Sequence, residues 1–171
     1  MQDSTNAYIV YNMRFSEEVI KMKKILIAVD GSKYSDKAVA EGVKIANAFG
    51  SKVVIVNVIH MMLPEGMHGH SAVQVDYSKI YDENIYQTAK EKSLEILDAA
   101  KKKFGELSAN VETFTLQGDV AKSIIEYVSK SDFDLVVLGS HGSGSVVGRL
   151  LMGSVTTKVL HHIDKPILVV K

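Results

Sequence analysis

Residues 25–36 read ILIAVDGSKYSD and join an apolar run to the beginning of a helical pattern. The five residues 25–29 are continuously apolar, which is typical of a short strand covered on both faces of its sheet. From Ser35 the apolar residues recur at spacings of three and four, which predicts a helix with Ser35 as its N-cap and Gly50 as its stop. The inward face of this helix is expected to hold Val39, Val43, Ala46 and Phe49.

The same alternation of strand and helix runs to the C-terminus. Strand patterns occupy 53–59, 111–116, 135–138 and 167–170. A helical pattern from about Asp82 to Phe104 is expected to turn inward Ile85, Ala89, Ile96, Ala100 and Phe104. Two more helices are marked by Val120, Ile124 and Val128, and by Val155, Val159 and Ile163. This order predicts an α/β fold with a single five-stranded, doubly wound parallel sheet and helices on both faces.

Two of the strand patterns differ from the others and are expected at the edges of the sheet. The stretch 111–116, VETFTL, alternates polar and apolar residues, so one of its faces is partly solvated. The stretch 167–170, ILVV, is fully apolar although it is the last strand. A bare apolar edge invites pairing with another strand. We therefore expect a homodimer that forms through residues 167–170.

The first 21 residues lie outside this regular pattern. They are expected to form an N-terminal arm, either a mobile, disordered tail or a segment whose apolar stretch 8–11 packs on a partner. Met22 precedes the first strong strand by two residues, so the regular domain is expected to span 22–171. No internal repeat is present.

The composition excludes several classes of protein. Apolar residues make up 46% of the chain and charged residues 23%, which favours one well-packed domain. Lys and Arg balance Asp and Glu at 20 each, so the charge gives no reason to expect nucleic acid or a membrane surface as partner. There is no cysteine, no apolar run of about 18 residues, and no convincing signal peptide. We expect a cytoplasmic protein.

The loops after the first and fourth predicted strands are the candidates for a ligand site, because doubly wound sheets bind ligands beyond the carboxyl ends of their strands. Asp30 follows the first strand and can hydrogen-bond a ribose, cap a helix or act as a base. The loop 139–154, GSHGSGSVVGRLLMGS, follows the fourth. Its glycines let backbone N–H groups approach an anion, and its far end opens the last helix at Val155. The alternative is a mobile connector.

Other motif interpretations fail on context. The loop 139–154 lacks the Gly-Lys-Ser/Thr of a Walker A sequence and the spacing of a dinucleotide fingerprint. His141 has no evident acidic partner for a catalytic triad. The stretch 60–70, HMMLPEGMHGH, gathers imidazole and thioether groups that suit copper, but a surface loop whose methionines cover apolar ground is the preferred interpretation. We expect no metal site in the protein itself.

Five segments together resemble the universal stress protein family. They are MKKILIAVDGSKYSDKAV, VVIVNVI, GDVAKSIIEY, LVVLGSHG and RLLMGSVTTKVLHHIDKPILVV, in one order over residues 22–171. The resemblance implies a Rossmann-like fold, related to the adenine-nucleotide α-hydrolases, with strand order 3-2-1-4-5 and a dimer through the last strand. One branch of the family binds ATP and carries the pattern G-x2-G-x9-G-[ST]. Gly139, Gly142, Gly153 and Ser154 match it, but ten residues instead of nine separate Gly142 from Gly153.

The resemblance also implies a set of nucleotide-binding positions. Asp30 lies on the ribose and Val58 offers main-chain contacts to adenine, with Mg²⁺ accompanying the ATP. The other implied positions are Ala28, Val29, Leu138, Gly139, Gly142, Gly153, Ser154, Val155 and Thr156.

The expected function is that of an ATP-binding regulatory protein of the stress-response type, a dimeric nucleotide-dependent switch. Two alternatives stay open: a slow ATPase, for which Asp30 and His141 are the only evident bases, and a dimeric scaffold that binds no nucleotide. The first alternative would make the protein at most a weak enzyme. No catalytic residue is assigned.

Overall fold

The computed structural model describes residues 7–10, 22–61, 80–142 and 152–171. The remaining residues of the arm, most of the 60–82 insertion and nearly all of the spacer between Gly142 and Gly153 lie outside the described residues. In chain order the elements are β1 (Ala7–Val10), β2 (Lys24–Ala28), α1 (Lys33–Phe49), β3 (Lys52–His60), α2 (Glu83–Lys102), a 3₁₀ helix (Gly105–Asn110), β4 (Val111–Gly118), α3 (Val120–Ser129), β5 (Leu135–Gly139), α4 (Ser154–His162) and β6 (Ile167–Val170).

The sheet confirms the predicted topology and adds a strand to it. Its order is β1-β6-β5-β2-β3-β4, and the five strands from β6 to β4 pair in parallel. Numbered among themselves, these five have the predicted order 3-2-1-4-5. The alternating strand 111–116, which the structure extends to Gly118, lies at one edge as expected.

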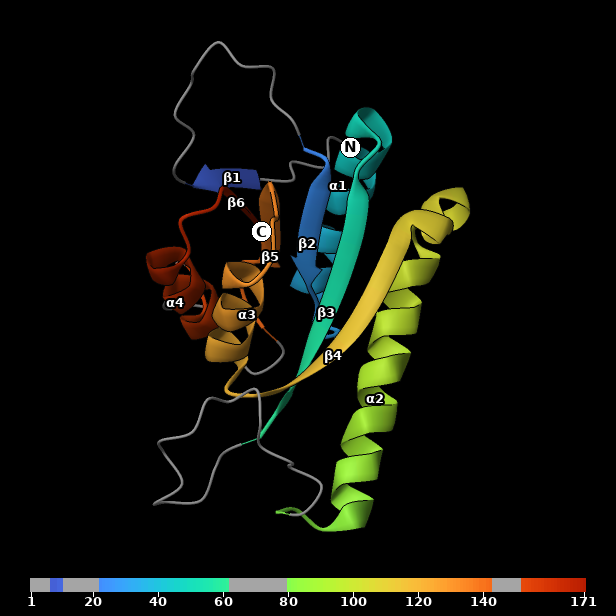
Figure 1. The fold of residues 1–171 in the computed structure, drawn as a ribbon, viewed down its shortest axis with the longest axis vertical. Coiled ribbons are helices and arrows are strands. Elements are labelled where there is room, and N and C mark those ends of the chain that lie inside the picture. The colour runs from blue at the N-terminus through green and yellow to red at the C-terminus, as the bar shows by residue number, and fades with distance from the viewer. Residues whose placement is uncertain (1–6, 11–21, 62–79, 143–151) are drawn as a thin grey trace.

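Helices cover the two faces of the sheet (Figure 1), and an apolar cluster of buried side chains lies on each face. On one face α1 and α2 pack against side chains such as Ile27, Ile55 and Val137. On the other face α3 and α4 pack against Leu26, Val56 and their neighbours. Successive residues of a strand point to opposite faces, so each central strand supplies both clusters. This explains why these strands are continuously apolar in the sequence.

Helix α1 begins three residues earlier than predicted. Its N-cap is Ser32, whose hydroxyl oxygen accepts a hydrogen bond from the Ser35 backbone N–H at 3.2 Å. Ser35 is instead buried inside the first turn, where its own hydroxyl donates to the Ser32 carbonyl. The predicted stop is confirmed, because Gly50 has φ 65° and closes the helix in the left-handed conformation. The last helix likewise begins one residue early, at Ser154.

Two predicted inward-facing residues are exposed. Ile85 is 62% exposed because the first turns of α2 lie beside the far ends of β3 and β4, beyond the point where β2 ends (Figure 1). Phe49 is 49% exposed because it is the last residue of α1, in the turn that the Gly50 cap ends. Farther along α2, Ala100 and the following Phe104 are buried as predicted, and Ala89 and Ile96 pack at the margins of the core.

The N-terminal arm contributes a strand that the sequence pattern does not indicate. Residues Ala7–Val10 pair antiparallel with β6, at the edge that was expected to be bare. The strand β6 therefore lies between β5 and β1 instead of forming the margin of the sheet (Figure 1). Within the described ranges, no helix is long and apolar enough to cross a membrane.

Gly42 lies where α1 packs closely on the sheet, and it generates a stability prediction. A Cβ atom at this position would lie 2.2 Å from Cδ1 of Ile27, which is completely buried. Overpacking costs about 1–3 kcal/mol, whereas replacing a helical glycine by alanine gains about 1 kcal/mol. We expect Gly42→Ala to lower the free energy of unfolding by up to about 2 kcal/mol in urea titrations, and the exposed Lys44→Ala to change it by less than about 0.5 kcal/mol. A Gly42→Ala protein that is more stable than the native chain would contradict this packing.

Candidate functional site

The carboxyl ends of β2 and β5 meet at the centre of the sheet. Ala28, the last residue of β2, pairs with Leu138, and Gly139 ends β5 one residue later. On either side of this pair the strand order runs in opposite directions, towards β4 and towards β6. Ligands of doubly wound sheets bind at such a switch point. The loops that carry Asp30 and Gly139 thus lie where a ligand is expected.

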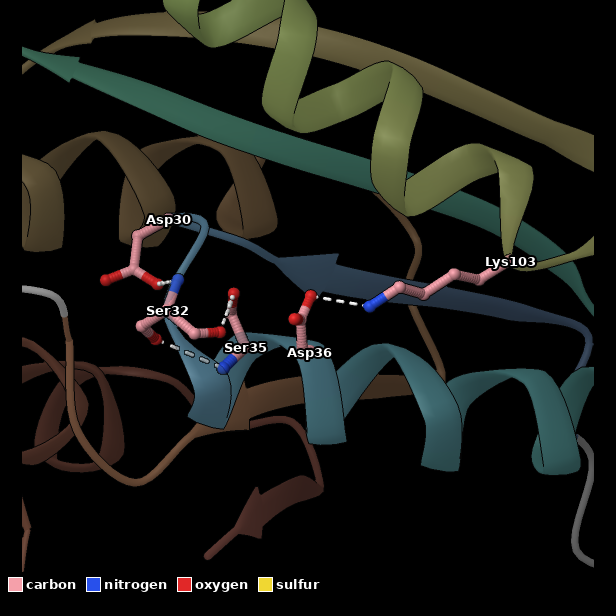
Figure 2. A network of polar contacts seen from close by, with 5 residues as sticks. All are labelled: Asp30, Ser32, Ser35, Asp36 and Lys103. Carbon is pink, nitrogen blue, oxygen red and sulfur yellow. Dashed lines mark hydrogen bonds and ion pairs between the residues drawn. The ribbon is translucent and has the colours of Figure 1, made fainter.

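The turn after β2 fixes the position of the Asp30 carboxylate. Its Oδ1 accepts a hydrogen bond from the Ser32 backbone N–H at 3.0 Å, as Figure 2 shows. Between them Gly31 has φ 77°, a conformation that favours glycine. Ser32 then caps α1, so the same short turn positions the carboxylate and begins the helix. Asp36, one turn further along α1, is directed away towards Lys103 at the end of α2, 2.6 Å distant.

The second oxygen of Asp30 faces Gly142, which belongs to the loop 139–154, called the glycine loop below. A Cβ atom on Gly142 would lie 3.0 Å from Asp30 Oδ2, a contact tighter than side chains normally make. The loop backbone therefore comes against the carboxylate at a residue that has no side chain. Asp30 and Gly142, 112 positions apart in the numbering, form one wall of the site.

Gly139 meets a different neighbour. A Cβ atom here would lie 2.8 Å from the carbonyl carbon of Tyr34 and 3.0 Å from the Ser35 nitrogen. The end of β5 thus packs against the backbone of the first turn of α1. This approach requires glycine for packing, whatever else the residue contacts.

Backbone and side-chain hydrogen bonds join the two ends of the glycine-rich loop. The Gly153 N–H donates to the Ser140 carbonyl at 2.7 Å, and the Thr156 hydroxyl donates to the Gly139 carbonyl at 2.9 Å. The segments 139–142 and 153–156, which were expected to hold phosphate together, are therefore adjacent. Residues 143–151 of the ten-residue spacer lie outside the described residues, so its extra residue is not tested.

The N-terminus of α4 opens at this junction without a side-chain cap. Its N-cap is Gly153, which makes no side-chain hydrogen bond to the helix, whereas Ser32, Asp82 and Asp119 cap α1, α2 and α3. The first backbone bond back to the cap comes from the Thr157 N–H, to the Gly153 carbonyl at 3.0 Å. The N–H groups of residues 154–156 precede it and have no partner within the helix. Such N–H groups and the helix dipole favour an anion.

Three predicted apolar positions lie on one face of the sheet. Ala28, Val58 and Leu138 all belong to the cluster that α3 and α4 cover. Val29 points to the opposite face and is buried. Val58 lies two residues beyond Val56, whose carbonyl accepts from the Val29 N–H at 2.9 Å, so Val58 extends past the end of β2.

Several buried polar residues of the site were not predicted. Asn57 donates from its side-chain amide to the Val29 carbonyl at 2.7 Å and so ties β3 to the turn that carries Asp30. Its signal was available, because it is the single polar residue in VVIVNVI. Ser140 and His141 are also buried, with the Ser140 hydroxyl 3.0 Å from His141 Nδ1. The His141 ring lies 5.1 Å from the Tyr34 ring, and these contacts fix the loop on α1.

The described residues offer no group of three or more His, Cys, Asp or Glu side chains that could hold a metal ion. Of the stretch 60–70, only His60 and Met61 are described, and Met61 is buried against Ile59 in a small cluster beside α2.

Solved structures with the same fold include complexes with nucleotides. The protein MJ0577 superposes with a TM-score of 0.71 at 23% identity, covering 90% of this chain and 97% of that one. A universal stress protein in complex with cAMP gives 0.59 at 23% identity, covering 87% and 97%. A universal stress protein from Archaeoglobus fulgidus in complex with dAMP gives 0.56 at 21% identity, covering 90% and 100%. At these identities the likeness establishes the fold.

The sequence comparisons give the family. A universal stress protein of Methanocaldococcus jannaschii is 31% identical over 149 residues, which cover 87% of this chain and 82% of that protein. The model of the universal stress protein family matches residues 21–171, from just before β2 to the last residue. With the strand order and the glycine loop already described, this match shows that the chain belongs to the universal stress protein family.

Proposed function

We propose that this chain is a cytoplasmic ATP-binding regulatory protein that acts as a nucleotide-dependent switch. The observation that carries the proposal is the approach of Gly142 to the Asp30 carboxylate at the switch point of the sheet. A carboxylate that can accept hydrogen bonds from ribose hydroxyls and a glycine backbone whose N–H groups can donate to phosphate are thereby placed side by side. The cAMP and dAMP complexes of fold relatives support adenine nucleotides as the ligand class.

Each part of the nucleotide has a proposed neighbour in the site. Asp30 accepts hydrogen bonds from the ribose, and the apolar positions Ala28, Val29, Val58 and Leu138 border the adenosine. The N–H groups that begin α4, at Ser154, Val155 and Thr156, hold the phosphates together with the loop that Gly139, Gly142 and Gly153 shape. Mg²⁺ arrives on the phosphates, because Mg²⁺ commonly binds through substrate phosphates and waters with few protein ligands.

The same loop is directly bonded to the last strand. The Ser140 N–H donates to the Val170 carbonyl at 2.7 Å, and Gly139 pairs with Val170 in the sheet. A nucleotide that orders residues 139–142 therefore acts on a segment that contacts β6. We propose that β6, residues 167–170, is also the strand through which two copies form a homodimer. This connection gives the switch a short path from ligand to interface.

One prediction about binding concerns Asp30. Loss of hydrogen bonds to a charged group costs about 1.5–3 kcal/mol, so we expect Asp30→Ala to weaken ATP binding roughly 10- to 100-fold in isothermal titration calorimetry. Asp36→Ala is the matched control, because this carboxylate points to Lys103 and away from the site. It should leave the affinity within about twofold. Equal affinities for ATP in the native protein and Asp30→Ala would refute the role given to this carboxylate.

The binding itself is tested by thermal unfolding of the native protein. ATP at about 100 times its Kd stabilises a binding-competent fold by about 2.7 kcal/mol, which raises Tm by roughly 5–10 °C for a domain of this size. Denaturing the freshly purified protein and analysing the supernatant by mass spectrometry would also detect any co-purified adenine nucleotide. No Tm change at millimolar ATP would favour the alternative, a scaffold that binds no nucleotide.

Another prediction separates binding from stability at two glycines. In Gly142→Ala the new methyl group presses on Asp30 Oδ2, so ATP affinity should fall at least about tenfold while Tm changes little. In Gly50→Ala the methyl group meets no atom within 4 Å, but φ 65° strains the helix end. This control should lose about 1 kcal/mol of stability and keep its ATP affinity. If Gly142→Ala binds ATP as tightly as the native chain, the loop does not hold the nucleotide against Asp30.

A further inference from the structure

We propose that β1 is an intramolecular cap, which occupies the outer edge of β6 and keeps a second copy of this chain from pairing there. The inference rests on the β6 homodimer proposed above and adds the condition under which it forms. The dimer requires β1 to leave the edge. The occupant of the edge in the single chain is thus the segment Ala7–Val10, and its competitor is a second copy of β6.

The pairing of β1 with β6 covers the whole length of the last strand. Ala7 faces Val170, Tyr8 faces Val169, Ile9 faces Leu168 and Val10 faces Ile167. On its other side β6 pairs with β5. Because N–H and C=O groups point alternately to the two sides of a strand, half of those in β6 are available to β5 and half to β1. A second copy needs the half that β1 occupies.

The cap lies outside the family domain. The family model begins at residue 21, whereas β1 ends at Val10. The domain from β2 to β6 has its own two apolar clusters, one on each face of the sheet. The arm is therefore an addition to the domain, placed on the one edge that is apolar and otherwise open.

Covalent attachment gives the cap an advantage over a second copy. A segment joined by a short connection reaches its site at an effective concentration in the millimolar range, about a thousandfold above a protein at micromolar concentration. The cap is also only four residues long, and each backbone hydrogen bond contributes about 0.5–1.5 kcal/mol. It is strong enough to exclude a weak partner and short enough to be released.

The first residue of the cap, Ala7, lies near the candidate nucleotide site. Ala7 faces Val170, and Val170 in turn pairs with Gly139 at the end of β5. Neighbouring strands are about 4.8 Å apart, so the backbone of Ala7 lies roughly 10 Å from the glycine loop. The loop, the last residue of β6 and the first residue of the cap thus form one row across the sheet.

The test is a pair of proline variants in the full-length chain. Adjacent residues of a strand direct their N–H groups to opposite sides, so Tyr8→Pro combined with Ile9→Pro removes at least one donor that faces β6. The matched control is Ser4→Pro with Thr5→Pro, which places two prolines in the arm ahead of the strand. The measurements are molar mass by light scattering over a micromolar concentration series, and hydrogen exchange at residues 167–170.

We expect the native chain and the Ser4/Thr5 control to be monomers at micromolar concentration and the Tyr8/Ile9 variant to form a dimer. The amides of β6 that face the edge should exchange slowly in the native chain at every concentration. In the Tyr8/Ile9 variant they should exchange fast at low concentration and slowly once the protein is concentrated enough to form the dimer. Three results would overturn the cap. They are dimers of all three proteins, monomers of all three, and a native dimer that the Tyr8/Ile9 variant dissociates, which would mean that β1 pairs with the β6 of the partner copy.

The Tm shift with ATP separates this test from that of the proposed function. Retention of the shift in the Tyr8/Ile9 variant shows that the domain has folded and binds nucleotide, so an unchanged mass then counts against the cap alone. If ATP raises Tm in none of the three proteins, while the Tyr8/Ile9 variant is still a dimer and the other two are monomers, nucleotide binding is refuted and the cap is supported.

Discussion

The end of β5 touches the backbone of the first turn of α1, and the rest of the site depends on this contact. A side chain at residue 139 would overlap Tyr34, so the strand and the helix could not meet as closely as they do. Because they meet, the loop that leaves β5 passes directly over the turn that leaves β2. The Ser32 hydroxyl then reaches the His141 carbonyl at 3.5 Å, and Gly142 comes against Asp30. The hydrogen bonds from Gly153 and Thr156 place the start of α4 on the same junction.

The parallel part of the fold could be predicted because its strands are buried on both faces. A continuous apolar run such as 25–29 is compatible with few environments, and the helices between the runs restrict the topology further. Helix ends were less certain. Ser32 and Ser35 are both good N-cap residues, and only the three-dimensional turn decides between them. The strand β1 was missed because four residues in a polar arm carry no periodic signal, and their pairing depends on an edge that is distant in sequence.

The site was predicted in part, and the residues differ in how far the sequence could define them. Asp30 and Gly142 were singled out by their places after two strands, and the structure brings them together. Gly139 and Thr156, which the family resemblance implies around the ribose and phosphates, also join β5 to α1 and to α4. A sequence does not distinguish a residue that contacts a ligand from one that holds the contacting backbone in place. Ser140 and His141, which were not predicted to lie in the site, are themselves buried residues of this loop.

The amide of Asn57 has a consequence for how the sheet assembles. Strands that are apolar on both faces can slide past one another by two residues with little change in hydrophobic burial, so burial alone selects the alignment of β2 and β3 poorly. Such a shift would move the Asn57 amide away from the Val29 carbonyl and leave a buried polar group without that acceptor, at a cost of about 1–3 kcal/mol. The Asn57 hydrogen bond therefore stabilises one register of β2 and β3 over others that bury the valine and isoleucine side chains equally well. This register also determines how far β3 extends past the end of β2. It therefore determines where Val58 lies relative to the turn that carries Asp30.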